Sequence, residues 1–212
     1  MKTCVIFCAG AFDGLAEPLD GACVIAADGG LRHVQALGLT PDVILGDFDS
    51  LGYVPDAARV FPVEKDDTDS MLAVRHGLAL GCRRFLLYGA LEGPRLDHTV
   101  ANLQTLQFLA DRGAEGYLMG NSVVTVVKNG KIAFPPVTDG LISVFCMGSD
   151  AENVTIRGLQ YSLENGRLTA GFPLGVSNHF VGKESEISVQ NGSLLVIYDR
   201  KVGFPHREVT GC

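Results

Sequence analysis

The first half of the chain alternates short, uninterrupted apolar runs with segments of helical periodicity. Continuous apolar runs are typical of buried parallel strands, and the segments between them are long enough for crossover helices. The pattern therefore predicts a mainly parallel sheet covered by helices on both faces. The predicted strands are 5–9, 22–27, 43–45, 60–63 and 85–88, and the predicted helices are 31–37, 68–80 and 96–109. In the last helix Leu96, Val100, Leu103, Leu106 and Leu109 are expected near one face.

The second half loses helical periodicity and consists of short strand candidates separated by turn signals. The candidates are 117–119, 123–127, 131–134, 141–146, 154–156, 187–189 and 194–198. Asn-Gly pairs at 129–130, 165–166 and 191–192 and Asp-Gly at 139–140 separate several of them, and such pairs favour hairpin turns. The pattern predicts an α/β N-terminal domain with a mainly parallel sheet at 1–122. An all-β antiparallel sandwich or barrel domain follows at 123–212, ending in a loose tail from 202.

Composition and charge narrow the function class. Of the 212 residues 47% are hydrophobic and 19% are charged, which suits a folded chain with a sizeable core. The formal net charge of −7 argues against nucleic acid or a membrane surface as partner, because both reward Lys and Arg. The six cysteines form no CxxC pair, so a reducing cytoplasm is the expected compartment. The uncharged run at 3–12 is interpreted as a buried strand rather than a signal peptide.

Acidic residues gather where predicted strands end or helices begin. Ligands of open parallel sheets bind outside the carboxyl ends of the strands, so these loops are expected to converge there. Two carboxylates ~4 Å apart repel by ~4 kcal/mol at an effective dielectric of ~20, and a cation would relieve this. Oxygen ligands without nearby His or Cys favour magnesium, calcium or manganese. The residues are Asp28 in ADGG, Asp47 and Asp49 in GDFDS, Asp66, Asp67 and Asp69 in KDDTDS, and Asp97 in RLDH.

The sequence also offers phosphate-binding groups. Lys65 and Arg95 are the natural partners, and the guanidinium of Arg95 suits bidentate contact with phosphate. Gly29 and Gly30 precede a predicted helix and would let the backbone approach a ligand closely. Neither GxGxxG nor the P-loop pattern occurs.

Each of these residues also has a purely structural interpretation. GDFDS could be a surface turn with a helix cap, Thr68 an N-cap, and Asp69 a first-turn acid favoured by the helix dipole. Arg95 and His98 could be ordinary surface side chains. Four acidic loops at strand ends are the observation that these interpretations do not jointly explain.

Six segments in this order resemble the thiamine pyrophosphokinase family. They are ADGG at 27–30, PDVILGDFDS at 41–50, EKDDTDSMLA at 64–73, GPRLDHTVANL at 93–103, GLQYSL at 158–163 and VSNH at 176–179. The resemblance implies transfer of a pyrophosphoryl group from ATP to the thiamine hydroxyl, with Mg²⁺ as cofactor and AMP as second product. It implies a nucleotide- and metal-binding catalytic domain followed by a thiamine-binding β-sandwich. It also implies a homodimer with the active site at the subunit interface.

The resemblance assigns roles residue by residue. Magnesium would be held by Asp47, Asp49 and Asp69. Nucleotide contacts would come from Asp28, Gly29, Gly30, Lys65, Asp66, Thr68, Arg95 and His98. Asp47, Asp69, Arg95 and Asp97 would be catalytic, with Asp97 a candidate general base, and Ser177 and Asn178 would contact thiamine.

This sequence departs from the family pattern at Pro94, Asp67, His179 and the segment 143–148. Two other functions fit the same residues. A magnesium-dependent phosphohydrolase would release phosphate without an acceptor alcohol, and a non-catalytic nucleotide- or thiamine-binding module would bind without turnover.

Overall fold

The computed structural model describes residues 1–49, 51–62, 67–93 and 95–209. The chain divides into two units, Met1–Gly120 and Asn121–Cys212, and each is described by itself. Within the described residues no helix is both long and apolar enough to cross a bilayer.

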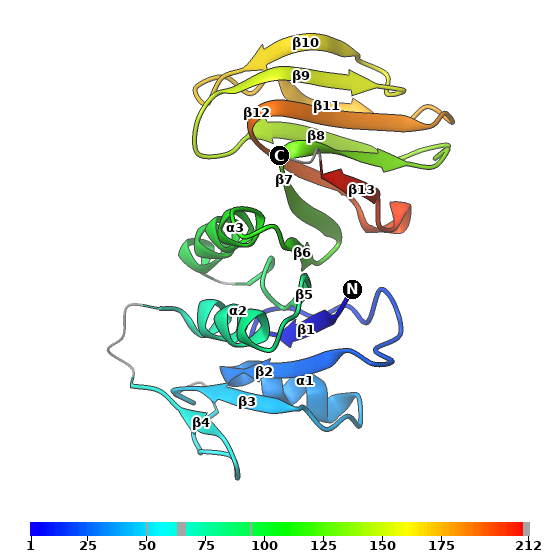
Figure 1. The fold of residues 1–212 in the computed structure, drawn as a ribbon. Helices are drawn as coiled ribbons and strands as arrows, with labels where there is room; N and C mark the ends of the chain where they lie inside the picture. The colour runs from blue at the N-terminus through cyan, green and yellow to red at the C-terminus, as the bar shows by residue number, and fades with distance from the viewer. Residues whose placement is uncertain (50, 63–66, 94, 210–212) are drawn as a thin grey trace. The chain divides into compact units, whose positions relative to one another are not determined.

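The first unit is built on a parallel sheet with the strand order β6-β5-β1-β2-β3-β4 (Figure 1). The chain adds β2, β3 and β4 on one side of β1 and then places β5 and β6 on the other. This reversal creates a switch point beside β1, where ligands of open α/β sheets bind. The strands are β1 (Thr3–Phe7), β2 (Cys23–Ala27), β3 (Val43–Gly46), β4 (Arg59–Val60), β5 (Arg84–Tyr88) and β6 (Glu115–Met119).

Among the residues that the structure describes, three α-helices cover this sheet. Helix α1 (Leu31–Ala36) packs on β1 and β2, α2 (Asp69–Ala79) packs on β1, β2 and β3, and α3 (Leu96–Ala110) packs on β6 and α2. A 3₁₀ turn, η1 (Asp28–Gly30), leads into α1. Every residue of β2, and all but the first of β1, β5 and β6, is buried. The prediction of a sheet covered on both faces is confirmed.

The buried face of α3 differs from the predicted one. Leu96 is 75% exposed and Val100 is 48% exposed, so placing them on the packed face was wrong. A polar residue begins the buried stripe instead. That stripe consists of Asn102, Thr105, Leu106 and Leu109.

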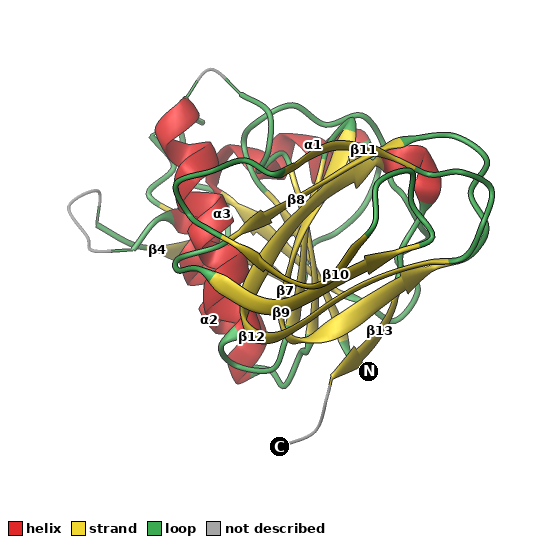
Figure 2. Cartoon of the chain, turned by 90° about the horizontal axis from the view of Figure 1, so that it is seen from above, coloured by secondary structure: helices red, strands yellow, loops and turns green. Residues whose placement is uncertain are grey.

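The second unit is antiparallel throughout, and two long strands form its centre (Figure 2). Strand β7 pairs along its length with β12, which also pairs with β9 through its first half and with β8 through its second half. Strands β10, β11 and β13 add to β9, β8 and β7 respectively. The bounds are β7 (Ser122–Phe134), β8 (Leu141–Cys146), β9 (Ala151–Arg157), β10 (Leu163–Leu168), β11 (Gly175–His179), β12 (Ser185–Asp199) and β13 (His206–Val209).

Three predicted turn pairs lie inside strands. Asn165-Gly166 lies within β10, where the pairing with β9 shifts register, and the other two are bulges inside long strands. Asn129-Gly130 lies within β7 and Asn191-Gly192 lies within β12, where the pairing register shifts between Val189 and Ser193. The two irregularities face each other, because the Gly192 amide donates a hydrogen bond to Asn129 Oδ1 at 3.0 Å. Asn129 has φ 43°, so the pair supplies the left-handed residue that a bulge requires, not a chain reversal.

The end of the chain is more ordered than predicted. Residues Arg200–Val202 form a 3₁₀ turn, η2, and β13 then pairs with β7. The expectation of a loose tail was therefore wrong for 202–209, while 210–212 lie outside the described residues. The predicted fold class, a parallel α/β unit followed by an antiparallel β unit, is confirmed.

Candidate active site

Three carboxylates meet at the carboxyl edge of the parallel sheet. One carboxylate oxygen each from Asp28, Asp47 and Asp69 lies within 4.8 Å of the other two. Asp28 follows β2, Asp47 follows β3, and Asp69 begins α2. The convergence of distant acidic loops expected from the sequence is thus present for these three residues.

Backbone geometry explains which carboxylates join this group. Asp28 has φ 47° and Phe48 has φ 61°, both in the left-handed region that non-glycine residues rarely adopt. Phe48 is 3% exposed, so its buried ring holds the loop in this conformation. The Asp-x-Asp segment is therefore not extended as the sequence argument assumed. Among the described residues Asp49 is exposed and is not in the group.

Glycines allow the loops to come together. A Cβ on Gly30 would lie 1.9 Å from the Phe7 carbonyl oxygen, and one on Gly89 would lie 2.4 Å from the Cys8 carbonyl oxygen. Both glycines contact the backbone at the end of β1, so neither position has room for a side chain. The sequence predicted that a ligand could approach the Gly30 backbone closely. In the structure, the group that lies close to Gly30 is the backbone of β1.

A hydrogen-bond chain fixes the first turn of α2 beside the carboxylates. Thr68 is the N-cap, and its Oγ1 accepts from the Met71 amide at 3.2 Å, as the structural interpretation predicted. Buried Ser70 donates from Oγ to Asn102 Oδ1 at 2.7 Å, and Asn102 donates from Nδ2 to the Ala90 carbonyl at 2.7 Å. The sequence interpretation missed Ser70 and Asn102. Their signal was a polar residue in the buried stripe of an apolar helix.

Arg95 and Asp97 form an exposed pair at the start of α3. Arg95 donates from Nε to Asp97 Oδ1 at 3.1 Å and from Nη2 to Asp97 Oδ2 at 2.5 Å. The hydrogen bond from Arg95 lowers the pKa of Asp97 from 3.8 to about 2. Asp97 raises the pKa of Arg95 in return, and the charge of Asp49 adds to this effect. His98, next to the pair, is also exposed.

The loop before α2 is described only in part, because Lys65 and Asp66 lie outside the described residues, as does Pro94. Asp67, one of the departures from the family pattern, is described. Its carboxylate lies 3.1 Å from Arg75 Nε, and the Arg75 guanidinium lies 5.3 Å from the ring centroid of Phe108. The additional negative charge is therefore paired along the side of α2.

In the β unit, Asn178 uses its side chain to hold Tyr161. Its Oδ1 accepts from the Tyr161 amide at 3.0 Å, and its Nδ2 donates to the Tyr161 carbonyl at 2.7 Å. Asn178 is 5% exposed, whereas Tyr161 is 60% exposed. Ser177 is exposed, has φ 58°, and donates from its amide to Ser143 Oγ at 3.1 Å.

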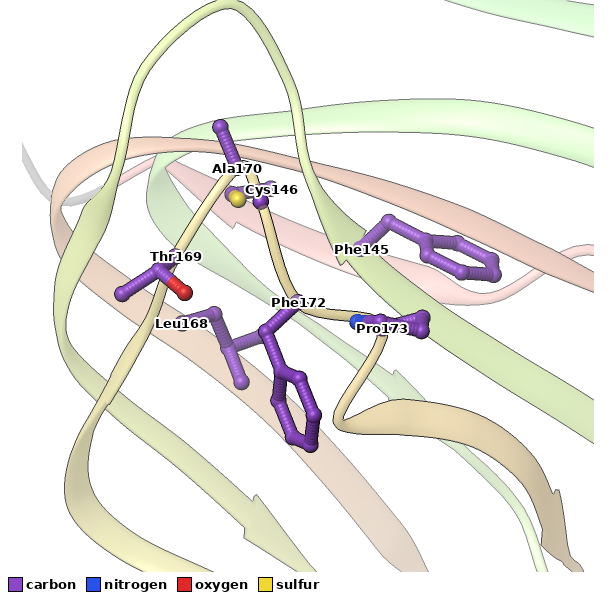
Figure 3. Close-up of a pocket in the computed structure, with 8 residues that line it drawn as sticks. Phe145, Cys146, Leu168, Thr169, Ala170, Phe172 and Pro173 are labelled. Carbon is purple, nitrogen blue, oxygen red and sulfur yellow. The ribbon is translucent and has the colours of Figure 1, made fainter.

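A pocket of about 190 Å³ lies in the same unit. Figure 3 shows its lining, which comes from the ends of β8 and β10 and from the loop that leads into β11. The lining is mostly apolar, with two aromatic rings and one thiol. It consists of Phe145, Cys146, Leu168, Thr169, Ala170, Gly171, Phe172 and Pro173.

The carboxylate group fits a hard divalent cation. At 4.8 Å a pair of carboxylates repels by about 3 kcal/mol for an effective dielectric near 20, and three such pairs share this site. The donors are all oxygens, the set that Mg²⁺ prefers.

Comparison with known proteins assigns both units to one enzyme class, the kinases that transfer a pyrophosphoryl group. The family model "Thiamin pyrophosphokinase, catalytic domain" matches residues 20–118, and "Thiamin pyrophosphokinase, vitamin B1 binding domain" matches residues 131–196. The chain belongs to the thiamine pyrophosphokinase family. It is therefore a transferase of thiamine diphosphate biosynthesis, with ATP and thiamine as substrates. The phosphohydrolase and binding-module alternatives are not favoured.

Relatives and solved structures agree with this assignment. Thiamine pyrophosphokinase of Bacillus subtilis is 27% identical over 190 residues, covering 82% of this chain and 85% of the relative. The crystal structure of thiamin pyrophosphokinase from Geobacillus thermodenitrificans superimposes with a TM-score of 0.77 at 26% identity, covering 94% of this chain and 97% of that one. The Bacillus subtilis crystal structure has a TM-score of 0.81 at 24% identity, covering 93% and 99%, and supports the fold.

Proposed function

We propose that the α/β unit binds ATP together with Mg²⁺, and that Asp28, Asp47 and Asp69 hold the ion. The proposal rests on one observation, the approach of their three carboxylates within 4.8 Å. Bound there, Mg²⁺ would neutralise charge on the phosphate oxygens and on the leaving AMP. Asp49 is not carried into this ligand set, because it is exposed and outside the group.

The remaining catalytic work would be positioning and charge stabilisation by the chain's own residues. The Ser70–Asn102 hydrogen bond fixes the turn that carries Asp69. Arg95 would bind phosphate oxygens through its guanidinium, and Asp97 would orient that guanidinium. A carboxyl with a pKa of about 2 is a weak proton acceptor, so we assign Asp97 to positioning rather than general-base catalysis. Nucleotide contacts by Gly29, Gly30, Lys65, Asp66, Thr68 and His98 stay predictions.

The β unit would provide the thiamine contacts. We propose that Ser177 contacts thiamine through its exposed side chain, and that Asn178 acts mainly by holding Tyr161 in place. An exposed aromatic ring fixed by two backbone hydrogen bonds suits stacking against an aromatic, cationic substrate.

The proposed assembly is a homodimer in which each thiamine site uses the β unit of the partner subunit. Large apolar side chains stand exposed around Ser177, which supports an interface there. They are Tyr161, Phe172, Leu174 and Val176. We further propose a cytoplasmic location, because all five described cysteines are free thiols.

The reaction test is to incubate the protein with ATP, Mg²⁺ and thiamine and to resolve the products by ³¹P NMR. AMP and thiamine diphosphate should form in equal amounts, and only when thiamine is present. Phosphate release without thiamine would contradict the transferase assignment. Asp28→Asn should lose activity while Asp49→Asn, its exposed counterpart, should keep most of it.

Subunit mixing tests the shared site. Asp69→Asn and Asn178→Ala proteins, each inactive alone, would be unfolded and refolded together. If each site uses both subunits, half the molecules are mixed dimers with one intact site, so about a quarter of wild-type activity should return. Recovery of no activity, with both variants folded and dimeric, would contradict a site built from two subunits.

A further inference from the structure

Three cysteines gather at the amino ends of β1 and β2, on the sheet edge opposite the carboxylate group. Cys4 and Cys23 are directly paired in the parallel register of these strands, so their side chains point to the same face. Cys82 follows α2, which packs on that part of the sheet. Each of the three thiols shifts the pKa of the other two, so all three lie close together. We call Cys4, Cys23 and Cys82 the thiol cluster.

A helix glycine makes room for the cluster. A Cβ on Gly77, in the interior of α2, would lie 2.9 Å from Cys4 Sγ and 2.6 Å from Phe85 Cε1. Glycine inside a helix costs about 1 kcal/mol relative to alanine. Here the missing side chain lets the end of α2 pack directly against the Cys4 thiol. Cys82, which follows α2, therefore lies near Cys4.

Charge and access single out one member of the cluster. Lys2 donates from Nζ to the Leu80 carbonyl at the end of α2, and its charge favours the thiolate of Cys23. The neighbouring Cys4 thiol, and then the charge of Lys2, lower the pKa of Cys23 against the opposing effects of burial and the charge of Asp42. Cys4 has its pKa raised, chiefly by Cys23 and by burial. Cys23 is 8% exposed, whereas Cys4 and Cys82 are 0% exposed.

We propose that the thiol cluster is an oxidative modification site, in which peroxide oxidises Cys23 and Cys82 then closes a disulfide with it. The Cys23 thiolate attacks one peroxide oxygen, the O–O bond breaks, and hydroxide leaves, giving a sulfenic acid on Cys23. The Cys82 sulfur then attacks the Cys23 sulfur, and the S–OH bond breaks to release water. Two thiols lose two electrons, and one hydrogen peroxide becomes two waters.

Cys82 is the partner rather than Cys4 for a geometric reason. Neighbouring parallel strands lie about 4.8 Å apart, and side chains in register project side by side, whereas a disulfide needs Cβ atoms about 3.8 Å apart. Cys4 and Cys23 are fixed by this register. Cys82 lies between α2 and β5, outside the strands, so its side chain is not held in that register beside Cys23.

The test is a disulfide map of the full-length protein after brief treatment with a slight molar excess of hydrogen peroxide. Free thiols are then blocked with iodoacetamide, and trypsin with Asp-N protease separates the relevant cysteines. Cys23 falls in peptide 20–27, Cys82 in 76–83, Cys146 in 139–149, and Cys4 with Cys8 in 3–12. The expected product is 20–27 linked to 76–83, reversed by dithiothreitol and absent from Cys82→Ala.

Cys146 provides the matched control, because it is more exposed than Cys23 and lies outside the cluster. Cys146→Ala should give the same linked peptide in the same yield. A link from 20–27 to 3–12, oxidation of Cys146 before Cys23, or no linked peptide would each overturn the proposal. The map in the unaltered protein decides the outcome even if a cysteine variant fails to fold.

Discussion

Gly46 lies so close to Asp28 that a Cβ at Gly46 would be 3.0 Å from the Asp28 Cα, Cβ and N atoms. Gly46 also has φ 148°, which side-chain-bearing residues rarely adopt. We predict that Gly46→Ala displaces Asp28 from Asp47 and lowers kcat/KM by about a hundredfold, because misplacement of about 1 Å has effects of this size. Steady-state assays over a range of Mg²⁺ concentrations measure this loss.

Gly38→Ala is the control for backbone strain alone. Gly38 has φ 68°, but a Cβ added there would meet no described atom within 4 Å. The substitution should lower the melting temperature slightly and leave kcat/KM unchanged. Equal losses of activity in the two variants would show that strain, not the contact with Asp28, matters.

The buried hydrogen bond between Ser70 and Asn102 should contribute to both stability and activity. Without the Asn102 side chain, the Ser70 hydroxyl loses this hydrogen-bond acceptor and the Ala90 carbonyl loses this donor. Asn102→Ala should therefore lower the unfolding free energy by about 2 to 3 kcal/mol. A double-mutant cycle with Ser70→Ala, measured by urea denaturation, should give a coupling energy of about 1 kcal/mol. Additive effects of the two substitutions would contradict direct coupling.

The Arg95–Asp97 pair sets a pH dependence. The pKa of Asp97 is lowered from 3.8 to about 2 by the hydrogen bond from Arg95, so the pair stabilises the fold above about pH 4. That contribution is lost as the pH falls through about 2. In Arg95→Gln the pKa of Asp97 should return toward 3.8, as measured by NMR titration of the carboxyl carbon. An unchanged pKa would contradict the assigned cause.

Arg75 should keep the negative charge of Asp67 away from ATP. Both side chains are partly exposed, so Arg75→Gln should change the unfolding free energy by less than about 1 kcal/mol. It should raise the KM for ATP severalfold with little effect on kcat, and adding Asp67→Asn should restore the KM. Arg112→Gln is the matched control, because Arg112 stacks on Phe108 at 3.4 Å from the ring centroid. An equal rise in KM in that control would point to loss of stacking instead.

Local patterns predicted most of the first unit. Apolar runs located β1, β2, β3 and β5 to within two residues, and acidic residues at strand ends located the carboxylate edge. Which carboxylate joins Asp47 and Asp69 depends on the backbone conformation of the loop after β3, which the order of acidic residues in the sequence does not reveal. Buried Phe48 adopts φ 61°, and this turns Asp49 out of the position that an extended Asp-x-Asp segment would give it.

The errors in the second unit have a common physical cause. Asn-Gly favours left-handed backbone, but whether that residue makes a turn or a bulge depends on the partner strand. At Asn129 the partner is β12, more than fifty residues away in sequence, with its own irregularity opposite. Strand β13 was missed for the same reason, since its pairing with β7 gives four polar-rich residues a strand conformation.

The most direct measurement of the central claim is Mn²⁺ binding by electron paramagnetic resonance, with Mn²⁺ standing in for Mg²⁺. Wild-type protein and folded Asp28→Asn and Asp49→Asn variants would be titrated under the same conditions. If Asp28, Asp47 and Asp69 hold the ion, Asp28→Asn should weaken binding by about tenfold or more, while Asp49→Asn binds like the wild type. Unchanged binding in Asp28→Asn, with loss in Asp49→Asn, would contradict the proposed site.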